Sequence, residues 1–148
     1  MKINFRRATA NDLEILDQLY TQNMQEYVEL NYPWNKDLFK SKFTPHDYIV
    51  LQKQNEIIGF LKVVLESSSL YLGEIQIKPS HQNKGIGTTV LKSLILSSKF
   101  NCRRIWLQVL KGNPTIKLYE RLGFIVFAET ATHYKMELLF DNDKTVAD

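Results

Sequence analysis

The chain has 148 residues, of which 44% are hydrophobic and 24% are charged, and its formal net charge is +3. This length predicts one domain over residues 1–148, and the composition argues against a disordered or fibrous protein. A small positive charge without a concentrated basic stripe gives no sign of nucleic-acid binding. No apolar run reaches the roughly 18–20 residues of a membrane span, so no membrane partner is expected.

The cysteine and histidine content indicates the cellular compartment and whether a metal site is expected. The single cysteine, Cys102, cannot form an internal disulfide, and no histidine lies near it in the sequence. We therefore predict a buried structural thiol in a reducing, cytoplasmic compartment. The N-terminal segment lacks the apolar stretch of a signal peptide. Three scattered histidines provide no metal-ligand spacing, so no metal is predicted.

The first third of the chain is predicted to be mainly helical. Alternating apolar residues indicate a short strand over residues 3–7. Thr9 and Asp12 then have the spacing of a capping box, and apolar residues at helical spacing follow them. Further helical segments are expected over residues 24–30 and 35–43.

After Pro45 the pattern changes to strands. Runs rich in β-branched and aromatic residues, separated by turns at Gln54-Asn55 and Ser67-Ser68-Ser69, indicate three consecutive strands. These strands are expected over residues 48–52, 57–66 and 70–78.

The rest of the chain alternates between helical and strand patterns. Helices are expected over residues 85–100 and 114–122, and strands over residues 104–110, 124–129 and 132–140. The polar residues 141–148 are expected to form a disordered tail. This order predicts an α/β (α+β) fold with a mixed, largely antiparallel central sheet of about six or seven strands and about four flanking helices.

The most informative segment lies between a predicted strand and a predicted helix, and it reads Gln82-Asn83-Lys84-Gly85-Ile86-Gly87-Thr88. Two glycines separated by one residue let the backbone approach a ligand closely. The first N–H groups of the following helix point outward at the positive end of the helix dipole. The segment therefore predicts a site for a diphosphate.

Two other phosphate-binding motifs do not fit the residues of this segment. A Walker loop requires Gly-Lys-Ser/Thr, but Lys84 precedes both glycines. A Rossmann fingerprint requires a third Gly or Ala, where this chain has Val90. A tight helix N-terminus that binds no ligand is the alternative that two glycines alone leave open.

Taken with its surroundings, the segment resembles the acetyl-CoA-binding motif of the GNAT superfamily. The matching residues are Gln-x-x-Gly-x-Gly at 82–87, preceded by the strand residues Ile75-Gln76-Ile77. A second block resembles the family's other signature: Asn113 followed by Leu118-Tyr119-Glu120-Arg121-Leu122-Gly123-Phe124. The resemblance covers residues 3–140. It implies a GNAT-like acyl-CoA N-acyltransferase fold and an enzyme that uses acetyl-CoA as co-substrate.

The resemblance also implies which residues bind the cofactor. Loop amides would bind the diphosphate, and the preceding strand would pair with the pantetheine arm through its backbone. The implied residues are Ile75, Gln76, Ile77, Gln82, Asn83, Lys84, Gly85, Ile86, Gly87, Thr88, Asn113 and Tyr119. An alternative for Asn113 is that it only caps the following helix.

Two residues are candidates for proton transfer. Tyr119 matches the family's tyrosine that faces the thioester sulfur, where a phenol can protonate the departing thiolate. Its alternative is a buried core ring. The positions where the family often carries a glutamate hold Tyr71 and Gln108 here, so Glu74 is the nearest carboxylate and the candidate base. A solvated Glu74, with a water chain in place of a dedicated base, is the alternative.

The acceptor substrate is the least determined feature. Aromatic and acidic residues that suit a cation, Tyr27, Glu29 and Trp34, lie where the family builds its acceptor cleft, and His133 lies on a strand expected to border it. Their alternative is ordinary surface and core packing. The leading hypothesis is acetyl transfer to a primary amine of a small molecule by a monomer or homodimer. A protein N-terminal or lysine acetyltransferase and a non-catalytic CoA-binding module are the alternatives.

Overall fold

The computed structural model describes residues 2–141, and in this part of the chain it contains four α-helices and seven strands. The helices are α1 (Leu13–Val28), α2 (Leu38–Lys42), α3 (Ile86–Ser98) and α4 (Ile116–Arg121). The strands are β1 (Asn4–Arg7), β2 (Tyr48–Lys53), β3 (Glu56–Glu66), β4 (Ser69–Ile77), β5 (Arg104–Leu110), β6 (Ile125–Glu129) and β7 (His133–Leu139). Residues 142–148 of the tail predicted over residues 141–148 lie outside the described residues.

The strands form one mixed sheet in the order β1-β2-β3-β4-β5-β7-β6. β4 and β5 are parallel, whereas β1–β2, β2–β3, β5–β7 and β6–β7 are antiparallel. The predicted fold class, a largely antiparallel mixed sheet with about four helices, is therefore confirmed.

The chain divides into two compact units. The first contains Met1–Val63 and Glu74–Ile86, and the second contains Val64–Gly73 and Gly87–Asp148. The elements β3, β4 and α3 each contribute residues to both units. The expectation of a single domain over residues 1–148 stays a prediction.

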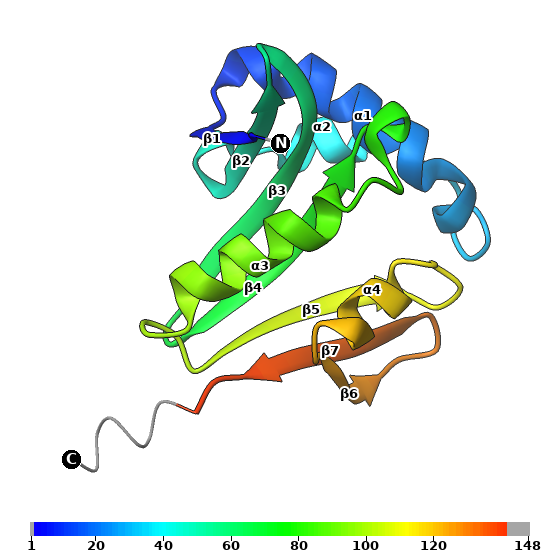
Figure 1. Cartoon of the computed structure of the whole chain (residues 1–148). Helices are drawn as coiled ribbons and strands as arrows, with labels where there is room; N and C mark the ends of the chain where they lie inside the picture. Colours follow the sequence, from blue (N-terminus) through cyan, green and yellow to red (C-terminus); the bar gives the residue numbers. More distant parts are fainter. Residues whose placement is uncertain (1, 142–148) are drawn as a thin grey trace. The chain divides into compact units, whose positions relative to one another are not determined.

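In the first unit, α1 and α2 lie beside β2 and β3 (Figure 1). An aromatic core lies between these helices and strands. Phe39 of α2 lies at its centre, with ring centroids 5.0 Å from Tyr20, 5.8 Å from Tyr48 and 5.8 Å from Phe60. Rings at these separations attract one another in addition to the apolar area that they bury. This core holds α1 beside the strands, and α1 supplies one of the polar residues described below.

The first helix differs from the sequence prediction at its C-terminal end. α1 is continuous from Leu13 to Val28, so the separate helical segment expected over residues 24–30 is wrong. No Gly or Pro interrupts the sequence between the two predicted segments, and the helix therefore continues. The predicted capping box is confirmed, because the Thr9 N–H donates a hydrogen bond of 2.8 Å to the Asp12 carboxylate.

The second unit is built on the β5–β7 pair, which runs in register from Arg104↔Leu139 to Leu110↔His133. β6 pairs with the other edge of β7, and β4 pairs with β5 from Ser69 to Leu72. Cys102 is buried, as predicted for a structural thiol. A Cβ at Gly87 would lie 3.2 Å from Leu118 Cδ2, so the first turn of α3 packs closely on α4.

Candidate active site

The loop between β4 and α3 has a backbone that turns sharply into the helix. Asn83 and Gly85 have φ angles of +61° and +79°, in the left-handed region that glycine favours and asparagine tolerates. A Cβ added at Gly85 would have no heavy atom within 4 Å. The space beside this glycine is therefore open.

The start of α3 presents backbone donors. Ile86, Gly87 and Thr88 are its first three residues, and N–H groups at these positions have no acceptor within a helix. Within residues 2–141, no described backbone hydrogen bond is donated by the N–H of Asn83 or Lys84. The arrangement agrees with the predicted diphosphate site, which stays a prediction.

Glu74, on β4 in the first unit, has an unusual environment. It keeps some exposed surface, but its carboxyl group lies deep among protein atoms, and this desolvation raises its pKa to about 7. A hydrogen bond from Gln76 and the charge of Lys62 oppose that rise. Burial also raises the pKa values of Tyr20 and Tyr48, with a smaller effect from the negative charge of Glu74. Both phenols are therefore protonated at neutral pH, where the raised pKa of Glu74 lies.

A chain of amide groups leads from Glu74 to the loop. Gln76 Nε2 donates to Glu74 Oε1 at 2.8 Å, and Asn23 Nδ2 donates to Gln76 Oε1 at 3.1 Å. Asn23 Nδ2 and Gln82 Nε2 both donate to the carbonyl oxygen of Ile77, each at 2.9 Å. The sequence gives no sign of the role of Asn23, because no local pattern relates an α1 residue to a partner 53 positions away.

The two positions at which the family resemblance places a glutamate contact each other in the second unit. Gln108 Nε2 donates to the Tyr71 hydroxyl at 3.3 Å, and the Tyr71 ring lies 4.5 Å from that of Trp106. Neither side chain can act as a carboxylate base, which leaves Glu74 as the candidate.

Tyr119 and Asn113 are engaged in local structure of the second unit. Tyr119 is buried on α4, and its ring centroid lies 5.8 Å from that of Phe124. Asn113 Oδ1 accepts the Thr115 N–H at 3.0 Å, just before α4 begins. This bond agrees with the capping alternative for Asn113. The catalytic role of Tyr119 and the cofactor contact of Asn113 stay predictions.

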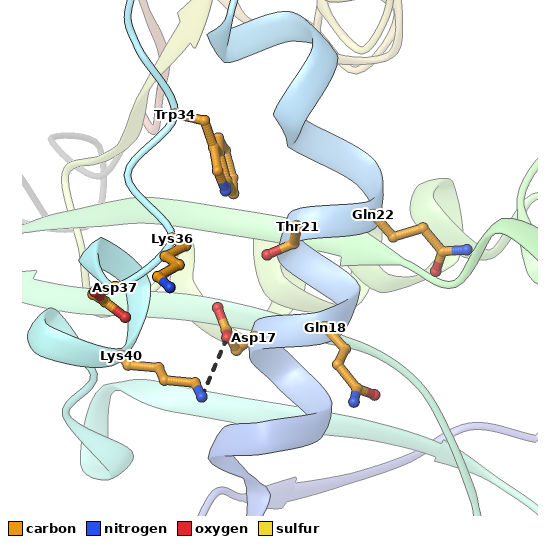
Figure 2. Close-up of a pocket in the computed structure, with 8 residues that line it drawn as sticks. All are labelled: Asp17, Gln18, Thr21, Gln22, Trp34, Lys36, Asp37 and Lys40. Atoms are coloured by element: carbon orange, nitrogen blue, oxygen red, sulfur yellow. Dashed lines mark ion pairs between the residues drawn. The ribbon is translucent and has the colours of Figure 1, made fainter.

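Of the residues predicted for the acceptor, only Trp34 is among those that line the described pocket. Trp34 borders an open pocket of about 550 Å³ in the first unit, together with Asp17, Gln18, Thr21, Gln22, Lys36, Asp37 and Lys40 (Figure 2). Its ring stacks at 5.9 Å from Tyr20. Tyr27 and Glu29 do not line this pocket. His133 belongs to the second unit, where its Nδ1 lies 2.8 Å from Thr132 Oγ1 and burial lowers its pKa.

The described residues contain neither a metal-binding cluster nor a membrane-spanning helix. In residues 2–141, no cluster of three His, Cys, Asp or Glu side chains is arranged to hold a metal ion. No helix in this part of the chain has the length and apolarity to cross a membrane.

Comparison with known proteins assigns the family. The model of the acetyltransferase (GNAT) family matches residues 13–124. The spermine/spermidine N(1)-acetyltransferase of Bacillus subtilis (strain 168) is 27% identical, with 99% of this chain and 97% of the relative covered. The ribosomal protein bS18-alanine N-acetyltransferase of Haemophilus influenzae is 31% identical, with 73% of each chain covered.

A solved structure supports the fold. The PaiA N-acetyltransferase from Thermoplasma acidophilum, crystallised in complex with coenzyme A, superposes with a TM-score of 0.78 at 19% identity, covering 95% of this chain and 100% of the other. The family match extends over more than half of the chain. This chain therefore belongs to the acetyltransferase (GNAT) family and is an acetyl-CoA-dependent acyltransferase.

Proposed function

We propose that the enzyme acetylates a primary amine of a small molecule in the cytoplasm, as a monomer or homodimer. The observation that carries this proposal is Glu74, whose carboxyl is desolvated enough for its pKa to lie at about 7 while the residue keeps some exposed surface. A general base needs both properties, because it must reach the substrate and exchange a proton near neutral pH.

Acetyl-CoA supplies an acetyl group activated as a thioester. We assign its diphosphate to the backbone N–H groups of Asn83 to Thr88, which combine a left-handed turn with the start of α3. Gln82 supports this loop through its hydrogen bond to the Ile77 carbonyl. The backbone of residues 75–77 is assigned to the pantetheine arm. Asn113 is assigned a contact through its side-chain NH₂ group, since its Oδ1 already accepts the Thr115 N–H.

Proton transfer is assigned to Glu74 and Tyr119. Glu74 accepts a proton from the substrate ammonium, directly or through one water, and so produces the neutral amine that attacks the acetyl carbonyl carbon. When the carbon–sulfur bond breaks, its electron pair goes to sulfur, and Tyr119 donates its hydroxyl proton there. The attacking nitrogen loses one proton as the amide forms, and this proton restores the Tyr119 hydroxyl, directly or through water. The water chain without a dedicated base is the competing mechanism.

The relative that aligns with 99% of the chain supports a small amine as the substrate. By its name, the Bacillus relative acts on spermine and spermidine, and its alignment spans 99% of this chain. The Haemophilus relative acts on an alanine of a ribosomal protein, and its alignment spans 73%. Polyamines are thus the first substrates to test, and a protein N-terminus is the second candidate.

The test measures release of free CoA from acetyl-CoA with a thiol reagent, together with the mass of the acetylated product. The panel contains spermine, spermidine, simple diamines, a peptide with N-terminal alanine and a lysine peptide blocked at its N-terminus. We expect the highest kcat/KM for a small amine. A preference for either peptide would contradict the small-molecule assignment. Tight CoA binding without turnover on any amine would indicate a non-catalytic module.

Tyr119→Phe tests the proposed acid. The phenylalanine ring preserves the packing on Phe124, so we expect a folded protein whose kcat is lower by about a hundredfold, the lower end of general acid catalysis. The measurement is kcat between pH 6 and 9 with the best amine. Turnover equal to that of the wild type, both below and above neutral pH, would show that the hydroxyl is not the acid.

A further inference from the structure

The amide chain next to Glu74 has a direction that can be deduced from one backbone atom. The carbonyl oxygen of Ile77 can only accept hydrogen bonds. Asn23 lies 2.9 Å from it, and therefore presents its NH₂ group to that oxygen. The same NH₂ group faces the Gln76 side chain at 3.1 Å, so Gln76 presents its oxygen to Asn23.

The orientation of the Gln76 amide determines which of its two ends the Glu74 carboxyl group meets. Once the oxygen of the Gln76 amide points to Asn23, its NH₂ group points the other way, and Gln76 Nε2 lies 2.8 Å from Glu74 Oε1. The carboxyl group thus meets a donor, which favours its ionised form. If the Gln76 amide were reversed, the carboxyl would meet an oxygen and would be ionised less readily.

Packing keeps Gln76 in place but does not choose between these two orientations. Its side chain is buried, with a relative exposure of 6%. A Cβ at Gly59 of β3 would overlap the carbonyl oxygen of Gln76, so the two strands approach closely there. Because the two ends of an amide have nearly the same shape, only hydrogen-bond partners can select the orientation.

We propose that Asn23 is a positioning residue, which acts through Gln76 to keep an N–H donor directed at the Glu74 carboxyl group. The proposal rests on the function given above only in calling Glu74 the base; the positioning itself is a property of the ligand-free protein. Gln82 Nε2 lies 3.4 Å from Asn23 Oδ1 and also binds the Ile77 carbonyl, so the entry of the loop shares the same anchor.

The other charged and titratable groups around Glu74 come from three elements. They are Tyr20 of α1, Tyr48 of β2 and Lys62 of β3. Lys62 Nζ lies 5.7 Å from the Tyr48 ring centroid. The substitutions below leave these groups unchanged, and Asn23→Ala adds no charge, so a change in Glu74 titration in that variant can be attributed to the amide chain.

The experiment is a titration of the Glu74 carboxyl by ¹³C NMR in the full chain without ligand, with labelled glutamate and assignment by Glu74→Gln. We expect a wild-type midpoint of about 7. Asn23→Ala releases the Gln76 amide and should raise the midpoint by about one pH unit. Asn23→Asp has nearly the same shape but can only accept from Gln76, so it should raise the midpoint at least as much. Asn11→Asp, an exposed site in the same unit, is the control and should leave it unchanged.

A double variant separates the positioning role of Asn23 from a purely structural role. Gln76→Leu should raise the midpoint by itself, and adding Asn23→Ala to it should cause no further rise, because Asn23 acts through Gln76. An unchanged midpoint in both folded Asn23 variants, or a further rise in the double variant, would overturn the proposal.

A second measurement, the pH profile of kcat/KM, tests whether Glu74 is the base independently of the positioning by Asn23. In the active enzyme, the acidic limb of kcat/KM should move with the NMR midpoint across these variants. If the midpoint moves and the limb does not, Asn23 positions Glu74 as inferred, but Glu74 is not the base.

Discussion

Glu74→Gln is expected to lower kcat at pH 7 by about 10²- to 10⁴-fold, the range that a positioned general base contributes. Glutamine preserves the size of the side chain and its contact with Gln76 but cannot take up a proton from an ammonium group. Glu14→Gln is the matched control on α1, since the Glu14 side chain is 71% exposed. We expect it to retain full activity. A Glu74→Gln enzyme with wild-type kcat would favour the water chain without a dedicated base.

The pH dependence of kcat/KM follows from the raised pKa of Glu74. With a pKa of about 7, Glu74 is mostly protonated at pH 6 and mostly ionised at pH 8. The kcat/KM of the wild type should therefore rise about tenfold per pH unit below pH 7 and level off above it, with this limb absent in Glu74→Gln.

The raised pKa of Glu74 also predicts that the Glu74→Gln variant is more stable than the wild type, although it is less active. The folded pKa is raised from 4.5 to about 7, so between these values the folded state binds more protons than the unfolded state. Stability therefore falls as the pH rises through this window. Glutamine carries no charge to desolvate, and we expect a higher Tm than that of the wild type at pH 8. Thermal unfolding at pH 4 and pH 8 checks this, because the difference should be small at pH 4.

Gly85→Leu is expected to weaken CoA binding by about a hundredfold or more. The open space beside Gly85 is where the proposed diphosphate lies, so a side chain there would displace the phosphates from the loop amides. Loss of charge-assisted hydrogen bonds, each worth about 1.5–3 kcal/mol, amounts to this reduction in affinity. Isothermal titration with CoA measures it.

A second glycine provides a control that separates the effect of backbone strain at Gly85 from the effect of lost ligand contact. Gly112 has a similar φ of +94°, and a Cβ there would also have no heavy atom within 4 Å. Leucine at either position should cost about 1–2 kcal/mol in stability from the left-handed backbone. We expect equal changes in Tm but a much larger loss of CoA affinity for Gly85→Leu. Equal affinity losses in the two variants, or none in Gly85→Leu, would contradict the loop assignment.

Several predictions from sequence depended on residues close together in the chain, and these were reliable. The turn at Gln54-Asn55 is confirmed by φ angles of +52° and +68°, which suit a tight hairpin. The strand over residues 104–110 is confirmed as β5. The capping box at Thr9 and the helix after the Gly-x-Gly segment were also found, because caps, glycines and hydrophobic periodicity act locally. The extent of α1 was misjudged where helical spacing weakened without any helix-breaking residue.

By itself, then, the sequence determined the element order, because hydrophobic periodicity and turn residues are local properties of the chain. Its two motifs carried the resemblance that implied the family. Alternation along β4 could not decide whether Glu74 is solvated or desolvated. Only the folded structure, in which burial raises the pKa of its carboxyl group, did so. The hydrogen bond between Asn23 and Gln76 likewise required the fold, since 53 residues separate them. The pKa of a carboxyl group depends on every atom nearby in space, and that neighbourhood exists only in the folded chain.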